Sequence, residues 1–419
     1  MKKFQRILLF ILLFGTMGIF GMIENIKGVS YPLIREEFGA TWEQQGLMVS
    51  LLAIAYVGFS VVAGIFLGRF GIKPSFLFGF GALCIGLFLV FFMPGFFLVA
   101  AALFVIFAGF GFFEIGINAL ASRLFVTKTA LLMSLLHSLY GIGAMIGPRA
   151  AGILANNVRF GWRYVYLFSL PLALVFFIPT IFTRFPEDGM EPAAEAQQGS
   201  NRRFGGSPPE TDSAGAAKSG RRKSFLDALK SPMVWIMSIA LGLAVVVEVS
   251  TSNWGAMYFW DVYGLSPGIE GAAFLSRFFL AFTISRLVCG LFVERIGYIR
   301  TLLGVAFIVL AIFVTGFFLG EKGIHLLPAL GFFVAMLWPT IMAVAIVSFG
   351  RDAPVFSSAM IAIGGLLNAA VQYFVGLTNK FFGPAWGYRS SILYTVLLII
   401  VLVALYRRLG RQTRKGVGN

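Results

Sequence analysis

Long apolar runs recur along the whole chain, and short segments rich in Gly, Pro or charged residues separate them. A helix needs about 20 apolar residues to cross the roughly 30 Å hydrocarbon core of a bilayer. Windows of that length predict twelve spans, at residues 7–33, 44–68, 74–93, 96–122, 130–156, 163–183, 231–259, 269–294, 299–319, 325–349, 354–380 and 386–407. Because a helix satisfies its own backbone hydrogen bonds in lipid, the pattern predicts an all-α membrane protein with twelve transmembrane helices.

The pattern is interrupted between the sixth and seventh spans, where Pro, Gly, Ser and charged residues dominate. The interruption divides the chain into an N-terminal six-helix bundle at 1–183, a cytoplasmic linker at 184–230 and a C-terminal six-helix bundle at 231–419. The composition of this linker is typical of a disordered segment. We expect its last residues, 224–230, to form a short amphipathic helix on the membrane surface.

The overall composition favours lipid as the surrounding solvent. Of the 419 residues, 58% are hydrophobic and only 12% are charged, which excludes a soluble globular protein. The net charge of +15 does not indicate a nucleic-acid partner, because the basic residues flank the spans. Lys and Arg are concentrated in the loops on the side of both termini. The positive-inside rule therefore predicts a protein of the cell (inner) membrane with both termini cytoplasmic.

Two predicted hairpins, at 64–71 and 290–297, have the same spacing of Gly, Arg and Gly between long apolar runs. A motif that recurs in the same context in both halves indicates a duplicated bundle. Parallel repeats of this kind build carriers that work by alternating access. We therefore expect the two six-helix bundles to be pseudo-symmetric.

The two hairpins resemble the signature loop of the major facilitator superfamily. Gly68 stands where that loop carries an acid, whereas Glu294 supplies the acid in the second hairpin. The resemblance extends over essentially the whole chain. It implies an inner gate formed by Arg69, Gly71, Glu294 and Arg295.

Ionisable residues deep inside a span are costly, so they usually face a cavity or a partner. Glu114 lies nine residues before Arg123, which marks the end of the fourth span, and is thus about 13 Å deep in the bilayer. His137 lies nine residues beyond Lys128 on the fifth span, at the same depth. We interpret this pair as proton-handling groups. The alternative is a neutral Glu114 that only hydrogen-bonds a neighbouring helix.

The sequence around Glu114 and the segment 135–148 resemble the fucose/proton symporter branch of the superfamily and its sugar-transporting relatives. The resemblance implies that Glu114 handles the proton and that His137 and Tyr140 touch a sugar. The first-helix acid of that branch is matched less well, because Glu24 lies about one turn before its place. Glu114 and His137 are the predicted proton-coupling residues, and Glu24 is included with them as the nearest acid on the first span.

Further intramembrane charges fall near one level in the other half of the bilayer. Glu24 and Lys27 are one turn apart and can pair, and Arg149 reaches a similar level on the fifth span. Glu248 and Arg277 do so on the seventh and eighth spans. These charges either pair as an outer gate or offer cations to an anionic solute. The alternative is that they serve folding and orientation, since Arg149 and Lys27 can also snorkel outward.

The seventh span contains a run of small and polar residues at 248–255, which favours local unwinding beside a cavity and a moving gate. Aromatic faces and amide groups in the later spans suit a sugar ring, although the same aromatic residues also serve packing. Together with the charges above, the predicted solute site consists of Glu24, Asn25, Lys27, Asn118, His137, Tyr140, Arg149, Glu248, Asn253, Trp254, Arg277, Trp338, Asn368 and Gln372.

The sequence carries no G-x-x-x-x-G-K-S/T nucleotide loop, and its two His and two Cys are isolated, so we expect neither an enzyme nor a metal site. The predicted function is a monomeric carrier in the lipid bilayer, without a cofactor, that moves a small polar solute. The solute is most simply a sugar or sugar derivative, driven by a proton gradient, with sodium as the alternative ion. Two other functions stay open: an exporter or flippase of drugs, organic anions or lysolipids, and a membrane sensor without transport.

Overall fold

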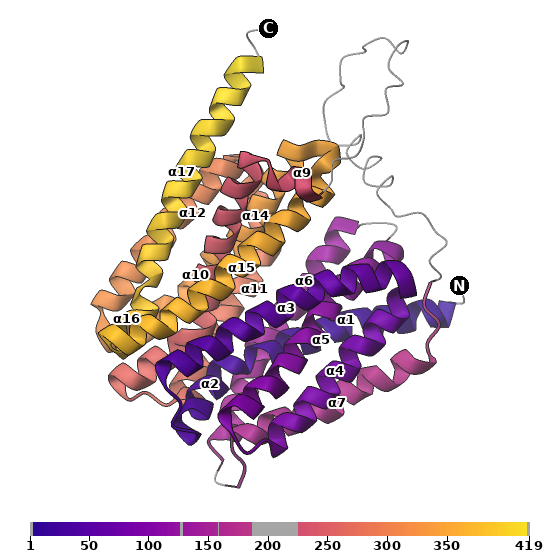
Figure 1. Cartoon of the computed structure of the whole chain (residues 1–419), viewed down its shortest axis with the longest axis vertical. Helices are drawn as coiled ribbons and strands as arrows, with labels where there is room; N and C mark the ends of the chain where they lie inside the picture. Colours follow the sequence, from indigo (N-terminus) through magenta and orange to yellow (C-terminus); the bar gives the residue numbers. More distant parts are fainter. Residues whose placement is uncertain (1–2, 126–128, 158, 187–224, 417–419) are drawn as a thin grey trace.

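The computed structural model describes residues 3–125, 129–157, 159–186 and 225–416. The chain forms two groups of long helices that lie side by side, coloured indigo to magenta and red to yellow in Figure 1. The first bundle consists of α1 (Lys3–Asn25), α2 (Lys27–Glu37), α3 (Trp42–Phe70), α4 (Ile72–Phe92), α5 (Phe96–Leu124), α6 (Thr129–Ala155) and α7 (Trp162–Phe182). Residues 187–224, most of the expected linker, lie outside the described residues.

The second bundle begins after the short helix α9 (Phe225–Leu229), where a short helix was predicted. Its long helices are α10 (Pro232–Tyr263), α11 (Ala272–Ile296), α12 (Tyr298–Phe318), α14 (Leu330–Phe349), α15 (Ala353–Phe382) and α17 (Ser391–Gly416). Short elements join them: η1 (Pro267–Gly271), η2 (Gly320–Lys322), α13 (Gly323–Leu326), η3 (Leu327–Ala329), η4 (Gly350–Asp352) and α16 (Pro384–Arg389).

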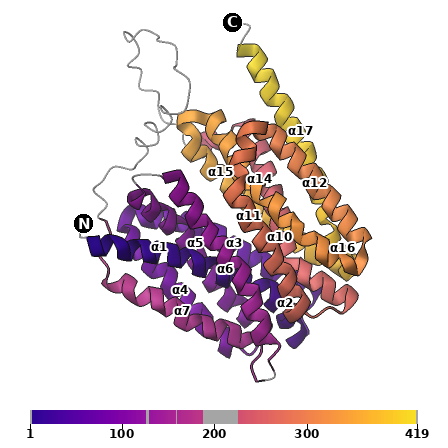
Figure 2. The same cartoon turned by 180° about the vertical axis from the view of Figure 1, so that it is seen from behind.

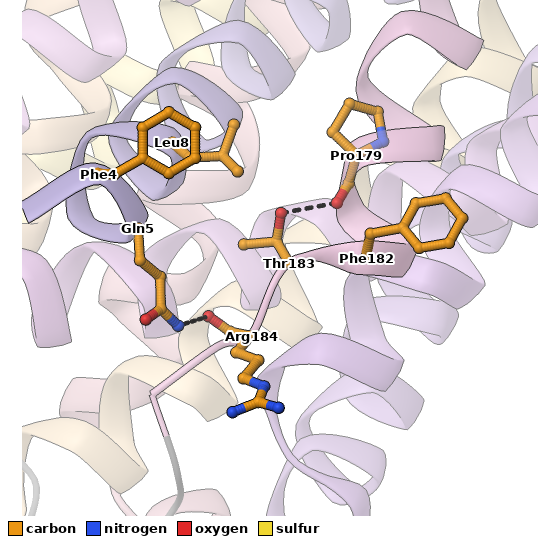
Figure 3. Close-up of a pocket in the computed structure, with 7 residues that line it drawn as sticks. All are labelled: Phe4, Gln5, Leu8, Pro179, Phe182, Thr183 and Arg184. Carbon is orange, nitrogen blue, oxygen red and sulfur yellow. Dashed lines mark hydrogen bonds between the residues drawn. The ribbon is translucent and has the colours of Figure 1, made fainter. Parts of the chain in front are cut away.

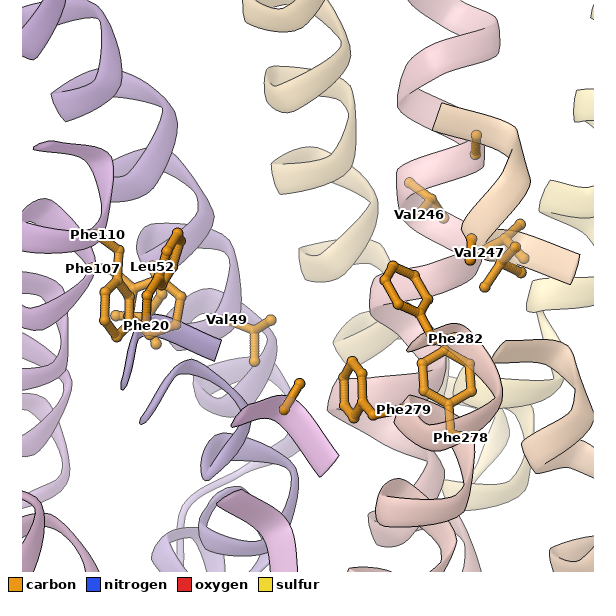
Figure 4. Packing of buried hydrophobic residues seen from close by; sticks show 14 of the residues in the cluster. Phe20, Val49, Leu52, Phe107, Phe110, Val246, Val247, Phe278, Phe279 and Phe282 are labelled. Carbon is orange, nitrogen blue, oxygen red and sulfur yellow. The ribbon is translucent and has the colours of Figure 1, made fainter. Parts of the chain in front are cut away.

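Within the described residues, eleven helical segments are long and apolar enough to cross a membrane. Helix α6 is a further helix of 27 residues that packs between α1 and α11. The buried apolar side chains of both bundles form one continuous cluster. Figure 4 shows Phe20, Phe107 and Phe110 packed within the first bundle and Phe278 and Phe282 within the second.

The two predicted hairpins have the same geometry in the structure. Gly71 ends α3 with a φ of 86°, and Gly297 ends α11 with a φ of 90°. Only glycine adopts this left-handed region without strain, which explains why it occupies both turns. Each turn is followed by a helix of 21 residues, α4 or α12.

The bundles meet along two seams, where α3 packs on α15 and α6 packs on α11. We call the end of the molecule at Gly71 and Gly297 the termini end and the opposite end the far end. The closest approaches lie toward the far end, where a Cβ on Gly46 would stand 2.9 Å from the Gly376 Cα and one on Gly152 would stand 2.1 Å from the Gly268 carbonyl oxygen. The ribbons of the bundles diverge toward the termini end in both views (Figures 1 and 2).

The predicted first span lies within one apolar helical segment, Phe4–Glu37, which is interrupted at Ile26 between α1 and α2. Pro32 lies inside α2 and cannot donate a backbone hydrogen bond to the Gly28 carbonyl, which weakens the helix next to this break. The predicted unwinding of the polar run at 248–255 is wrong, because α10 is helical throughout its 32 residues.

Candidate functional site

The break in the first span carries a group of bonded polar side chains. The Lys27 Nζ lies 3.1 Å from the Glu24 Oε1, and the Tyr140 hydroxyl donates to the Glu24 Oε2 at 2.6 Å. The Asn25 amide donates to the Gly21 carbonyl at 2.8 Å and to the Tyr140 hydroxyl at 3.3 Å. Tyr140 reaches this place because α1 and α6 touch at Gly21, where a Cβ would stand 2.1 Å from the Tyr140 carbonyl oxygen.

A second carboxylate, that of Glu114 on α5, lies close to this group. The Tyr56 hydroxyl donates to the Glu114 Oε2 at 3.2 Å, and the Asn118 amide donates to the Oε1 at 3.2 Å. The Phe20 ring separates the two groups, with its centroid 5.4 Å from that of Tyr140 and 6.4 Å from that of Tyr56. Glu24 and Glu114 are within electrostatic reach of each other.

The second bundle presents charges to the same place. Arg286 on α11 is within electrostatic reach of Glu114 and His137 in the first bundle and of Glu248 on α10. Glu248 in turn is within reach of Glu24 and Lys27. We call this group the central cluster, and its members are Glu24, Lys27, Glu114, His137, Tyr140, Glu248 and Arg286.

Sequence reasoning missed two members of this environment, Arg286 and Tyr56. Arg286 has the same signal as Glu114, because it is an ionisable residue in the middle of a predicted span, and the rule applied to Glu114 would have found it. Tyr56 carries no such signal, since a tyrosine in an apolar helix is compatible with simple packing. Only its hydrogen bond to Glu114 identifies it.

The predicted amides and tryptophan of α10 and α15 form a separate polar chain. The Trp254 indole donates to the Gln372 Oε1 at 2.8 Å, Asn253 donates to the same oxygen at 3.4 Å, and Gln372 donates to Asn368 at 3.1 Å. Trp254 is 1% exposed and Gln372 is fully buried. These side-chain hydrogen bonds link α10 to α15. Two other polar residues of the run, Thr251 and Ser252, bond carbonyls of α10 itself.

Three other predicted solute residues lie apart from the central cluster. Arg149 is exposed on the same face of α6 as Ile142, Ile146 and Ile153. Arg277 bonds the Ala273 carbonyl and the His325 ring, both at 3.1 Å. Among the described residues, Glu248 and Arg277 do not form an ion pair, although one was hypothesised. Trp338 is half-buried on α14 and packs on the apolar core.

The predicted gate residues lie at the termini end. Arg69, Glu294 and Arg295 are exposed there, and the Arg69 guanidinium lies 5.4 Å from the centre of the Phe70 ring. Among the described residues, Arg69, Glu294 and Arg295 form no ion pair.

Ion pairs between the bundles instead close the far end. Arg35 on α2 pairs with Asp261 on α10, and Lys380 on α15 pairs with Glu43 on α3. The Arg35 guanidinium also lies 3.9 Å from the centre of the Trp42 ring. These pairs were not predicted from the sequence, since each residue taken alone is an ordinary charge at the end of a span.

A cavity of about 410 Å³ lies between the beginning of α1 and the end of α7 (Figure 3). Its lining is mostly apolar, and the Gln5 amide donates to the Arg184 carbonyl at 2.6 Å at its edge. It contains no residue of the central cluster. We therefore do not assign it to the solute.

Comparisons with known proteins agree with the arrangement of the helices. A family model described as Major Facilitator Superfamily matches residues 12–366. The chain is 23% identical over 406 residues to the Saccharomyces cerevisiae protein "Bypass of stop codon protein 6", covering 93% of this chain and 78% of that protein.

Two solved structures share the fold. A bacterial homologue of the human lysosomal transporter Spinster, in an inward-facing and unoccupied conformation, has a TM-score of 0.77 at 14% identity and covers 99% of both chains. The fucose:proton symporter FucP of E. coli has a TM-score of 0.62 at 18% identity, with 96% of this chain and 99% of that chain covered. At these identities the likeness establishes the fold alone.

Proposed function

Because the chain belongs to the major facilitator superfamily, we propose that it is a secondary carrier that moves a small polar solute by proton-coupled alternating access. In this proposal α6 also crosses the membrane, which raises the number of spans from eleven to twelve. The two bundles are then pseudo-symmetric halves of six spans each. The carrier is a monomer in the cell membrane with both termini in the cytoplasm. The distribution of Lys and Arg in the loops supports this orientation.

We propose a sugar or sugar derivative as the solute. The similarity to a fucose:proton symporter supports a sugar, and the tyrosines and amides around the central cluster supply donors and acceptors for hydroxyl groups. The residues that we propose contact the sugar belong to the central cluster or bond to it. They are Glu24, Asn25, Lys27, Asn118, His137, Tyr140 and Glu248.

The contacts between the bundles support an inward-open state. Ion pairs and glycine contacts join the bundles at the far end, while Arg69, Glu294 and Arg295 are exposed at the termini end. In the proposed cycle Glu114 accepts a proton together with solute from the far end. Rocking of the bundles then releases both at the termini end.

A single observation carries this proposal: ionisable groups of both bundles lie within electrostatic reach of one another. They come from helices α1, α2, α5, α6, α10 and α11. Such groups are expensive in a membrane interior and persist where they face a cavity or a functional partner. Because the cluster includes residues of both bundles, rocking must change its charge environment. This is the requirement for coupling a proton to solute movement.

The test is accumulation of a radiolabelled solute, identified by thermal-shift screening of sugars, in proteoliposomes with an imposed pH gradient. One pH unit corresponds to about 1.4 kcal/mol per proton, so the wild-type protein should accumulate solute about tenfold per unit. Glu114→Gln should remove this accumulation but retain exchange of solute across the membrane, because exchange needs no net proton movement. Glu321→Gln, which alters an exposed carboxylate, is the matched control.

Full pH-driven accumulation by Glu114→Gln would refute the coupling assignment. Accumulation that is driven by sodium and insensitive to pH would show that the coupling ion is sodium and not the proton. Stabilisation by lysolipids but not by sugars would favour the amphiphile exporter.

A further inference from the structure

Among the described residues, Arg286 is the member of the central cluster that has a buried hydrogen-bond donor without an acceptor. Its Nε is buried and unbonded, and its guanidinium lies 4.9 Å from the centre of the Phe282 ring. A buried donor without a partner is costly in a native structure, and a ligand that supplies the missing acceptor would account for it. The guanidinium presents a planar fork of donors that matches a carboxylate or a phosphate.

The position of Arg286 in the fold places it where the bundles separate. Helices α6 and α11 cross closely at Gly141, where a Cβ would stand 2.1 Å from the Thr283 hydroxyl oxygen. One helical turn from this crossing toward the termini end lie His137 on α6 and Arg286 on α11. Arg286 therefore lies at the start of the divergence between the bundles.

Ionisable groups of three other helices face Arg286. Glu114 on α5 and His137 on α6 belong to the first bundle, and Glu248 belongs to α10. The Glu24–Lys27 pair is within electrostatic reach of Glu248 and is internally balanced. The carboxylates of Glu114 and Glu248 both attract the Arg286 guanidinium, but among the described residues neither forms an ion pair with it.

We propose that Arg286 recognises one acidic group, a carboxylate or a phosphate, on the transported solute. The solute class is then an acidic sugar derivative or a similar small organic anion. This inference rests on the proposed carrier function and makes it more specific. Proton uptake by Glu114 removes a negative charge that faces Arg286, so proton binding and acid binding should reinforce each other.

The test is ligand binding by thermal shift to the purified full-length protein, with D-glucuronate, D-glucose 6-phosphate, D-glucose and D-glucosamine as probes. We expect at least one of the two acids to stabilise the wild-type protein with a lower apparent Kd than glucose. Arg286→Gln should weaken acid binding at least tenfold, and Arg286→Lys should weaken it less. The control is Arg300→Gln, which removes an exposed charge of α12. Comparing glucuronate with the phosphate ester distinguishes the two acidic groups.

The pH dependence gives a second readout that a merely structural arginine would not move. Glucuronate affinity should rise severalfold from pH 8 to pH 6 in the wild-type protein. Glu114→Gln should reduce this rise, and Glu114→Gln, Glu248→Gln should remove it, because these are the two carboxylates that face Arg286. If Arg286→Gln does not fold, Arg286→Lys still tests the proposal through its lower acid affinity.

Stabilisation by glucose or glucosamine alone, equal acid binding by Arg286→Gln, or no binding of either acid would each overturn the inference. A carrier that accumulates glucose normally would in that case leave the proposed function intact. Conversely, acid binding that depends on Arg286 in a protein without any flux in proteoliposomes would support acid recognition by Arg286 and overturn the carrier function.

Discussion

At the scale of single residues, the site depends on tyrosine hydroxyls that bind carboxylates. Glu24 accepts from Tyr140, and Glu114 accepts from Tyr56, with the Phe20 ring between the two pairs. A hydroxyl holds a carboxylate in place without a fixed charge of its own. Each carboxylate can therefore gain or lose a proton while keeping its hydrogen-bonding partner.

We predict that Tyr140→Phe destabilises the fold, because it removes the 2.6 Å bond to Glu24 and leaves a partly buried carboxylate oxygen without that donor. Hydrogen bonds to charged groups contribute roughly 1.5–3 kcal/mol, so the midpoint of chemical unfolding in detergent should fall measurably. Tyr164→Phe is the control, since the Tyr164 ring packs on Phe160 and Phe168. Equal unfolding midpoints for Tyr140→Phe and the wild-type protein would contradict the prediction.

At the scale of helices, glycine contacts set how closely the bundles approach at the far end. A Cβ on Gly376 would stand 2.6 Å from the Trp42 carbonyl oxygen and 2.7 Å from the Gly46 Cα. Both neighbours are backbone atoms, which cannot move without shifting a helix. The α3–α15 seam therefore closes fully only with glycine at this crossing.

We predict that Gly376→Leu forces α3 and α15 apart and shifts the protein toward a state that is open at the far end. The measurement is the rate at which a membrane-impermeant maleimide labels Met257→Cys, a buried position near the far end, in a Cys84→Ser, Cys289→Ser background. The rate should rise severalfold. Gly58→Leu is the matched control on α3, because a Cβ there has no atom within 4 Å. A rate unchanged by Gly376→Leu would show that this crossing does not limit opening.

At the scale of the whole molecule, two ion pairs join the bundles across the far end. Arg35 and Asp261 have side chains that are 17% and 18% exposed, whereas Lys380 and Glu43 are 45% and 41% exposed. Solvent screens the second pair more strongly, and exposed pairs contribute only about 0.2–1 kcal/mol. The Arg35–Asp261 pair should therefore contribute more to closure.

We predict that Arg35→Asp opens the far end more than Lys380→Asp does, as measured by the same labelling rate at Met257→Cys. Reversal of one partner replaces attraction by repulsion, and reversal of both should restore it. The double variant Arg35→Asp, Asp261→Arg should consequently label at close to the wild-type rate. High salt should reduce these differences, more so for Lys380→Asp. If the double variant labelled as fast as Arg35→Asp, the pair would not be what holds the far end closed.

The sequence by itself determined the class of the protein and the positions of most of its long apolar helices. The observed bounds of α3, α4, α5, α7 and α12 lie within about two residues of the predicted spans. Span length follows from the local free energy of transferring consecutive apolar residues into lipid, and that quantity can be read along the chain. Membership of the superfamily, which the hairpins suggested, is confirmed by the family match over 12–366.

Only the tertiary structure decided which polar residues share one environment. It brings Arg286 into the central cluster and leaves Arg149 and Arg277 outside it, although all three are cations within spans. It places the helix break at Ile26, while the polar run of α10 stays helical, with Thr251 and Ser252 bonded to carbonyls of the same helix and with Asn253 and Trp254 bonded to Gln372 on α15. Such outcomes depend on the rotation of each helix and on its neighbours across the bundle, and these are set by packing between segments far apart in sequence.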